Sequence, residues 1–205
     1  MTTVYLVRHS EPFKIHRGIE EINEDILFSN IKSPLSVNGE KLAEEKSSEE
    51  EFSNIDVIWS SDYVRTMSTA KWFAYRNNLK VNVSDKLGER KHGINSWDEL
   101  PSDFEVRQFE DENYKIGNGE SRKEVSLRLF NKLMEIVNEN IDKRILIVGH
   151  STAFAYLFSN WCEVSYASDY KFNNEVFFDG KWEYLETFKL IFDDNNNLID
   201  IVNVK

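Results

Sequence analysis

Short apolar runs alternate along this chain with longer stretches in which apolar residues recur every three or four positions. The runs at residues 4–7, 55–59 and 145–148 have the length of buried strands. Helical spacing is clearest at residues 121–140, where one apolar stripe is formed by Val125, Leu129, Leu133, Ile136 and Val137. Strands that alternate with helices predict an α/β fold with a mostly parallel sheet.

Two further helices are predicted between these runs. Ser36 is a suitable N-cap for a charged helix that extends to about Glu51. A second helix follows Tyr63 and places Arg65 in its first turn. Residues 80–83 have the composition of a short strand, and residues 145–161 are interpreted as a buried strand followed by a helix.

The C-terminal part has a different pattern. Residues 182–192 and 198–204 are rich in aromatic and β-branched residues and flank a polar turn, which indicates an antiparallel hairpin at a sheet edge. We therefore predict a three-layer α/β sandwich with a mostly parallel central sheet, helices on both faces and one antiparallel edge hairpin. We expect a single domain over residues 1–205, with a small lid-like insertion at about 88–118.

Composition and charge narrow the classes of partner. The net charge of −11 argues against binding to nucleic acid or to an anionic membrane, because both need a broad basic face. The single cysteine, Cys162, excludes an internal disulfide and favours a reducing compartment. With no secretion signal at the start and no long apolar segment, a cytoplasmic location is expected. The oligomeric state is left open.

Two histidines follow apolar runs directly. Arg8 and His9 come after residues 4–7, and Gly149 and His150 come after residues 145–148. Because parallel strands end at one edge of the sheet, we expect both rings to meet where α/β folds bind ligands. Arg8 and Arg65 add guanidinium groups that fit phosphate oxygens and keep their charge. This set predicts a pocket for a phosphoryl group.

Six segments, in order, resemble those of the histidine phosphatase superfamily, the phosphoglycerate-mutase-like proteins. They are VYLVRH at 4–9, PLSVNG at 34–39, SSDYVRTMSTA at 60–70, LxExxxG at 87–93, GES at 119–121 and VGH at 148–150. None is specific alone, but six in the same order make chance agreement improbable.

The resemblance implies a mechanism and a role for each residue. His9 would accept the phosphoryl group as a phosphohistidine, which water then hydrolyses. Arg8, Arg65 and His150 would bind the phosphate, and Glu89 would protonate the leaving group. The substrate would be a small phosphorylated molecule or a phosphoprotein. Neither a metal nor another cofactor is expected, because the arginines supply the positive charge.

Three other functions share some of these features. Glu89-Arg90 resembles the arrangement in phosphoglycerate mutases, but this chain lacks the lengthy lid and tail with which mutases retain a bisphosphate. A phospho-ligand binding module without activity would need neither His9 nor Glu89. The segment around Ser151 resembles a nucleophile elbow, but an α/β-hydrolase needs a histidine after the serine, and none follows residue 150.

Some assignments are less specific. Three other carboxylates could replace Glu89 as the acid: Glu11, Asp98 and Glu99. His16 and His92 are interpreted as surface or lid residues. Ser10 and Ser151 stand where most relatives have glycine, so their side chains are expected close to the phosphate, where they either crowd it or donate hydrogen bonds.

Overall fold

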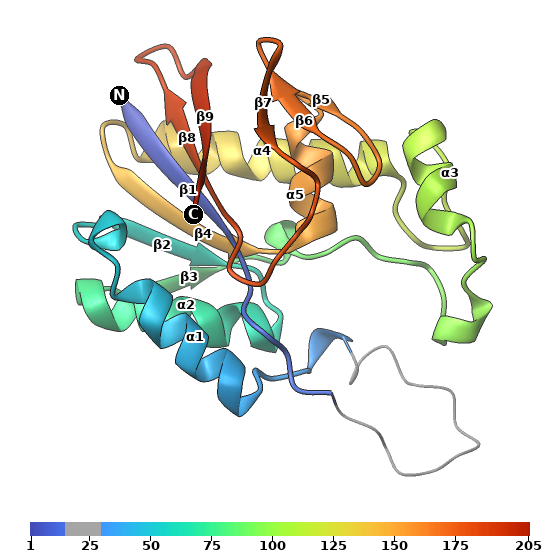
Figure 1. Cartoon of the computed structure of the whole chain (residues 1–205), viewed down its shortest axis with the longest axis horizontal. Coiled ribbons are helices and arrows are strands. Elements are labelled where there is room, and N and C mark those ends of the chain that lie inside the picture. Colours follow the sequence, from blue (N-terminus) through green and yellow to red (C-terminus); the bar gives the residue numbers. More distant parts are fainter. Residues whose placement is uncertain (15–29) are drawn as a thin grey trace.

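A six-stranded sheet forms the centre of the computed structural model, which describes residues 1–14 and 30–205 (Figure 1). Its order is β3-β2-β4-β1-β8-β9. The strands are β1 (Thr2–Arg8), β2 (Val57–Ser60), β3 (Val81–Val83), β4 (Arg144–Gly149), β8 (Thr187–Phe192) and β9 (Leu198–Val204). The first four are mutually parallel, whereas β8 runs antiparallel to β1 and β9 antiparallel to β8. The predicted mostly parallel sheet with an antiparallel edge hairpin is confirmed.

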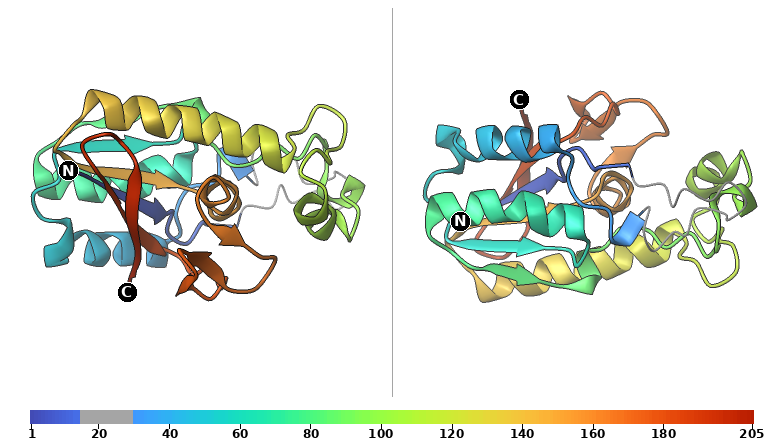
Figure 2. Two further views of the ribbon diagram at one scale, coloured as in Figure 1. Left: turned by 90° about the horizontal axis from the view of Figure 1, so that it is seen from above. Right: turned by 90° about the horizontal axis from the view of Figure 1, so that it is seen from below.

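Helices cover both faces of this sheet (Figure 2). The helices α1 (Val37–Ser47) and α2 (Val64–Asn77) lie on one face, and α4 (Arg122–Glu139) and α5 (Ser151–Phe158) lie on the other. Side chains of β1 alternate accordingly: Tyr5 and Val7 belong to the core beside α2, and Val4 and Leu6 to the core beside α4 and α5. The predicted three-layer sandwich is confirmed.

The first helix is shorter than predicted. Its N-cap is confirmed, because the Ser36 hydroxyl accepts a hydrogen bond from the Gly39 N–H at 2.9 Å. The helix ends at Ser47 instead of continuing to about Glu51. A 3-10 turn at Glu50–Phe52 follows, and it buries the Phe52 ring. The polar residues around Phe52 give no sign in the sequence that the helix ends before this ring.

A second, three-stranded sheet was not predicted. It consists of β5 (Glu163–Val164), β6 (Tyr170–Phe172) and β7 (Glu175–Phe178), all antiparallel. Strands this short give no usable alternation in the sequence. The sheet is held by aromatic packing on α5: the Phe158 ring lies 5.7 Å from Phe177 and 6.4 Å from Tyr170. The strand predicted from residue 182 begins at Thr187, after an irregular turn.

Residues 88–118 form the segment predicted as a lid. They contain a 3-10 turn at Trp97–Glu99 and the short helix α3 (Phe104–Glu110), which lies to the side of the central sheet (Figure 1). Residues 12–34, whose polar composition is typical of a loop, are described only at 12–14 and 30–34. Within the described part of the chain, no helix is both long and apolar enough to cross a membrane.

Candidate active site

The two histidines lie together because β1 and β4 are neighbours in register. Arg8 pairs with Gly149 across the two strands, and the His9 N–H donates to the Gly149 carbonyl at 3.0 Å. The side chains that directly follow the two strands therefore lie at the same edge of the sheet. The rings of His9 and His150 are 5.4 Å apart between centroids.

His9 presents an unprotonated Nε2. Its Nδ1 lies 2.8 Å from the Ser10 carbonyl oxygen, which can only accept, so Nδ1 carries the hydrogen and Nε2 keeps a lone pair. Burial holds the pKa of His9 well below its ordinary value, and the charges of Arg65 and Arg8 lower this pKa further. The side chain is 6% exposed. His9 is therefore neutral at physiological pH and has the form that a nucleophile needs.

His150 is the opposite tautomer. Arg65 in the first turn of α2 donates from Nη2 to Nδ1 of His150 at 3.1 Å, and a guanidinium cannot accept, so His150 carries its hydrogen on Nε2. That nitrogen donates to the Ser61 hydroxyl at 2.8 Å. Both ring nitrogens are thus bonded within the protein. The predicted contact of His150 with phosphate requires the Arg65 bond to open; as it stands, His150 orients Arg65.

Arg8 has spare hydrogen-bonding capacity. Its Nη1 donates to the Trp182 carbonyl at 2.8 Å, and its guanidinium lies 4.9 Å from the centroid of the Tyr184 ring. Its Nε is buried and has no hydrogen-bond partner among the residues that the structure describes. A buried donor without a partner is costly, so this atom favours an anionic ligand with oxygen acceptors.

Glu89 lies at the N-terminus of α5 and close to both arginines. Its Oε1 accepts from the N–H of Ala153 and from the N–H of Arg90, each at 2.9 Å. Burial lowers the pKa of Arg8 and of Arg65, and the Glu89 charge opposes this shift in both. The carboxylate therefore shares one electrostatic environment with the predicted phosphate site.

The alternative carboxylates have other partners. Glu11 accepts hydrogen bonds from Ser36 and Asn38 at the start of α1. Asp98 accepts from the Ser96 hydroxyl, and Glu99 from the Asn95 N–H, both within residues 88–118. Across the described residues, no group of three or more His, Cys, Asp or Glu side chains is arranged to hold a metal ion.

The expectation that the Ser10 hydroxyl meets the phosphate is corrected. Ser10 is fully buried, and its hydroxyl donates to the Gly39 carbonyl at 2.7 Å. The backbone of α1 approaches closely here, since a Cβ on Gly39 would lie 2.2 Å from the Glu11 carbonyl oxygen. Ser10 thus fixes the loop after β1 to α1. Ser151 is the first residue of α5 and is partly exposed.

Arg90 and His92 tie residues 88–118 to the core. The Arg90 side chain is buried, and its two terminal nitrogens donate to Glu105, Gln108 and Tyr156. His92 lies 2.7 Å from Arg90 Nη2, and burial together with the Arg90 charge lowers the pKa of His92 to about 4. His92 is thus a partly buried residue of the segment 88–118. His16 lies outside the described residues.

Two residues near the site were missed from the sequence. Ser61 comes directly after β2, and its N–H donates to the Val148 carbonyl. The rule applied to the histidines, that polar residues at strand ends meet at one edge, would have identified it. Tyr184 lies in the irregular turn before β8, with its ring 6.3 Å from the His9 ring. No periodic pattern indicates its position.

Comparison with known proteins places this arrangement in context. The family model of the histidine phosphatase superfamily (branch 1) matches residues 4–176. The chain is 30% identical over 161 residues to phosphoserine phosphatase 1 of Hydrogenobacter thermophilus, and the alignment covers 74% of this chain and 72% of that one.

Solved structures share the whole fold. A mycobacterial glucosyl-3-phosphoglycerate phosphatase in complex with inorganic phosphate superposes with a TM-score of 0.71 at 18% identity, covering 98% of this chain and 97% of that one. A phosphoserine phosphatase of Entamoeba histolytica in complex with 3-phosphoglyceric acid superposes with a TM-score of 0.68, also at 18% identity, covering 100% and 98%.

Proposed function

This chain belongs to the histidine phosphatase superfamily, and from that membership we propose that it hydrolyses phosphomonoesters through a phosphorylated His9. The observation that carries the proposal is the tautomer of His9. Its Nδ1 is committed to the Ser10 carbonyl, so the lone pair of Nε2 is available beside two guanidinium groups.

In the first step, the Nε2 lone pair of His9 forms a bond to phosphorus while the bond from phosphorus to the leaving oxygen breaks. Arg8 and Arg65 neutralise the phosphoryl oxygens, whose charge would otherwise repel the nucleophile. The Glu89 carboxyl group gives its proton to the leaving oxygen, which departs as an alcohol.

In the second step, the oxygen of a water molecule forms a bond to phosphorus as the phosphorus–nitrogen bond breaks. The proton of that water passes to the Glu89 carboxylate, and His9 returns to its neutral state. The net reaction consumes one ester and one water and yields an alcohol and inorganic phosphate. We expect no metal in either step, because the two arginines supply the positive charge.

Phosphatase activity is favoured over mutase activity by the position of Arg90. The Glu89-Arg90 pair resembles the mutase arrangement, but the terminal nitrogens of Arg90 donate to Glu105 and Gln108 of α3 and to Tyr156 of α5. Its guanidinium is 2% exposed and so does not bind a second anionic group of a substrate. We further propose that residues 88–118 act as a lid, since Arg90 fixes this segment next to Glu89.

The substrate proposed is a small phosphorylated metabolite. His9 and Arg65 are each only 6% exposed, which favours a compact phosphoryl donor over a folded phosphoprotein. The relatives named for phosphoserine and glucosyl-3-phosphoglycerate phosphatase activity support the same class. We also propose a cytoplasmic location, supported by the single cysteine.

Phosphate release from phosphoserine, 3-phosphoglycerate and p-nitrophenyl phosphate tests this function. We expect turnover by the wild type and a loss of about 10³-fold or more in His9→Ala. Wild-type protein quenched in alkaline SDS should contain a base-stable, acid-labile phosphohistidine, and His9→Ala should not. Isomerisation of 3-phosphoglycerate without phosphate release, after a trace of 2,3-bisphosphoglycerate is added, would establish the mutase instead.

Arg65 has a matched control on the same helix. Arg65→Gln should raise KM by about 10-fold or more through the loss of a charge-assisted bond to phosphate. Arg76→Gln, an exposed arginine in the last turn of α2, should leave both kcat and KM unchanged. Equal effects of the two changes would mean that general surface charge, and not the site, binds the substrate.

A further inference from the structure

The turn at residues 182–186 brings an aromatic ring to the catalytic side chains. The Tyr184 ring lies 4.9 Å from the Arg8 guanidinium and 6.3 Å from the His9 ring. We propose that Tyr184 is a specificity-determining residue whose ring contacts the leaving group of the phosphomonoester. This inference rests on the proposed function.

Arg8 holds the turn at both ends. The backbone N–H of Arg8 donates to the Glu186 carbonyl at 2.9 Å, and its side chain donates to the Trp182 carbonyl at 2.8 Å. The residue predicted to bind phosphate therefore also fixes the loop that carries Tyr184. The position of the ring relative to the phosphoryl group is set by the same side chain.

Leu185 anchors the turn from below. Its φ of 62° lies in the left-handed region, which is unfavourable for a bulky side chain, and the side chain is buried in the core beside α2. Burial of Leu185 offsets the backbone strain. With Leu185 directed into the core, the neighbouring Tyr184 is left at the surface.

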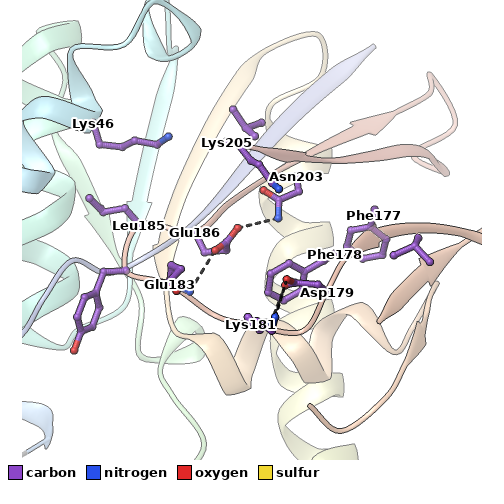
Figure 3. Close-up of a pocket in the computed structure, with 13 residues that line it drawn as sticks. Lys46, Phe177, Phe178, Asp179, Lys181, Glu183, Leu185, Glu186, Asn203 and Lys205 are labelled. Carbon is purple, nitrogen blue, oxygen red and sulfur yellow. Dashed lines mark hydrogen bonds and ion pairs between the residues drawn. The ribbon is translucent and has the colours of Figure 1, made fainter. Parts of the chain in front are cut away.

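On its other side, the turn borders a cavity and few side chains pack against it. A cavity of about 630 Å³ lies there, bounded by the turn, by Lys46 near the end of α1 and by β7 and the end of β9 (Figure 3). Hydrogen bonds hold the turn on this side. The Glu186 carboxylate accepts from the Glu183 N–H and from the Asn203 side chain. The turn is thus held by bonds at defined atoms.

Tyr184 is more exposed than the two histidines of the site. Tyr184 is 41% exposed, whereas His150 is 0% and His9 6% exposed. Tyr63, whose ring lies 4.8 Å from the Arg65 guanidinium, is buried and cannot reach a leaving group. A phosphoryl group bound at His9 must direct its ester substituent toward solvent, and, among the described residues, Tyr184 has an aromatic ring that lies next to both His9 and Arg8 and is exposed.

The chemistry of the ring defines the preferred substrate class. A half-exposed tyrosine offers an apolar face to planar or apolar groups and a hydroxyl to polar ones. Esters with an apolar or planar surface next to the ester oxygen should gain affinity from the ring. Inorganic phosphate, which has no leaving group, should gain none.

The test compares KM for p-nitrophenyl phosphate with the inhibition constant of inorganic phosphate. In Tyr184→Ala we expect KM to rise about tenfold, the usual magnitude for a lost aromatic contact, while the inhibition constant changes by less than about twofold. Tyr184→Phe should retain nearly wild-type KM. The matched control is Tyr75→Ala, which removes an exposed tyrosine from α2 and should change neither constant.

Two outcomes overturn the inference. An unchanged KM in Tyr184→Ala means that the ring does not contact the substrate, and a parallel rise in both constants means that it only holds Arg8. If Tyr184→Ala does not fold, Tyr184→Leu provides the same comparison. Should the wild type show no turnover, the proposed function fails separately, and calorimetric binding of phenylphosphonate against inorganic phosphate to the same variants then decides the inference.

Discussion

At the scale of single residues, the chemistry of the partners determines which nitrogen of each ring can react. A carbonyl oxygen can only accept and a guanidinium can only donate, so His9 and His150 are held as opposite tautomers. Their roles differ for this reason: His9 has a free lone pair, while His150 orients Arg65.

Ser10 is held in a structural hydrogen bond although it directly follows His9, the proposed nucleophile. In Ser10→Ala the hydrogen bond to the Gly39 carbonyl is lost, and we expect the free energy of unfolding to fall by about 1 kcal/mol. KM for substrate should stay within twofold. Urea unfolding and steady-state kinetics check the two quantities; a large rise in KM without a loss of stability would show that the hydroxyl binds phosphate after all.

At the scale of elements, one carboxylate links two segments. Glu89 caps the N-terminus of α5 through Ala153, and the next residue, Arg90, bonds to Glu105 of α3. Helix α5 follows directly from His150. The proposed acid, the segment 88–118 and the second histidine are therefore connected through adjacent backbone positions.

Glu89→Gln separates the capping role from the acid role. An amide oxygen can still accept from Ala153 and Arg90, so we expect stability to fall by no more than about 1 kcal/mol. The rate should fall by about 10²-fold for phosphoserine, whose alkoxide must be protonated as it leaves. It should fall far less for p-nitrophenyl phosphate, whose phenolate leaves readily. Equal losses on both substrates would exclude Glu89 as the acid.

At the scale of the whole molecule, the fold holds at least three imidazoles neutral. Burial, the largest cause in each, lowers the pKa of His9, His92 and His150. The unfolded chain takes up protons on these rings as the pH falls through about 6.5, while the folded protein does not. Their contribution to stability is complete above pH 6.5 and is lost as the pH falls toward the folded values.

Stability should therefore decline in mild acid. Each ring lowers the free energy of unfolding by about 1.4 kcal/mol per pH unit as the pH falls from 6.5 to the pKa of that ring in the folded protein. For His92 this pKa is about 4. His92→Gln should make the slope of unfolding free energy against pH shallower by about 1 kcal/mol per unit, allowing for its partial exposure. Urea unfolding at pH 5.0 to 6.5 measures this slope; an identical slope in the variant would mean that His92 is charged in the folded protein.

Several features were determined by the sequence alone. The apolar runs and helical stripes specify the parallel strands, the flanking helices and the edge hairpin, because burial of one face is a local requirement on the pattern. The strand ends specified that His9 and His150 meet, and the motif order identified the family. The second sheet could not be predicted from the sequence, because its strands are only two to four residues long and are stabilised by packing against Phe158.

Only the tertiary structure decided how the side chains of the site are used. Hydrogen-bond partners far apart in sequence fix the tautomer of His150, direct the Ser10 hydroxyl to Gly39 and turn Arg90 toward α3. Tyr184 reaches His9 through an irregular turn whose shape depends on Arg8 and on the burial of Leu185. The periodicity of apolar residues in the sequence does not predict such contacts, because each contact is made by a pair of atoms and not by a whole face of a helix or strand.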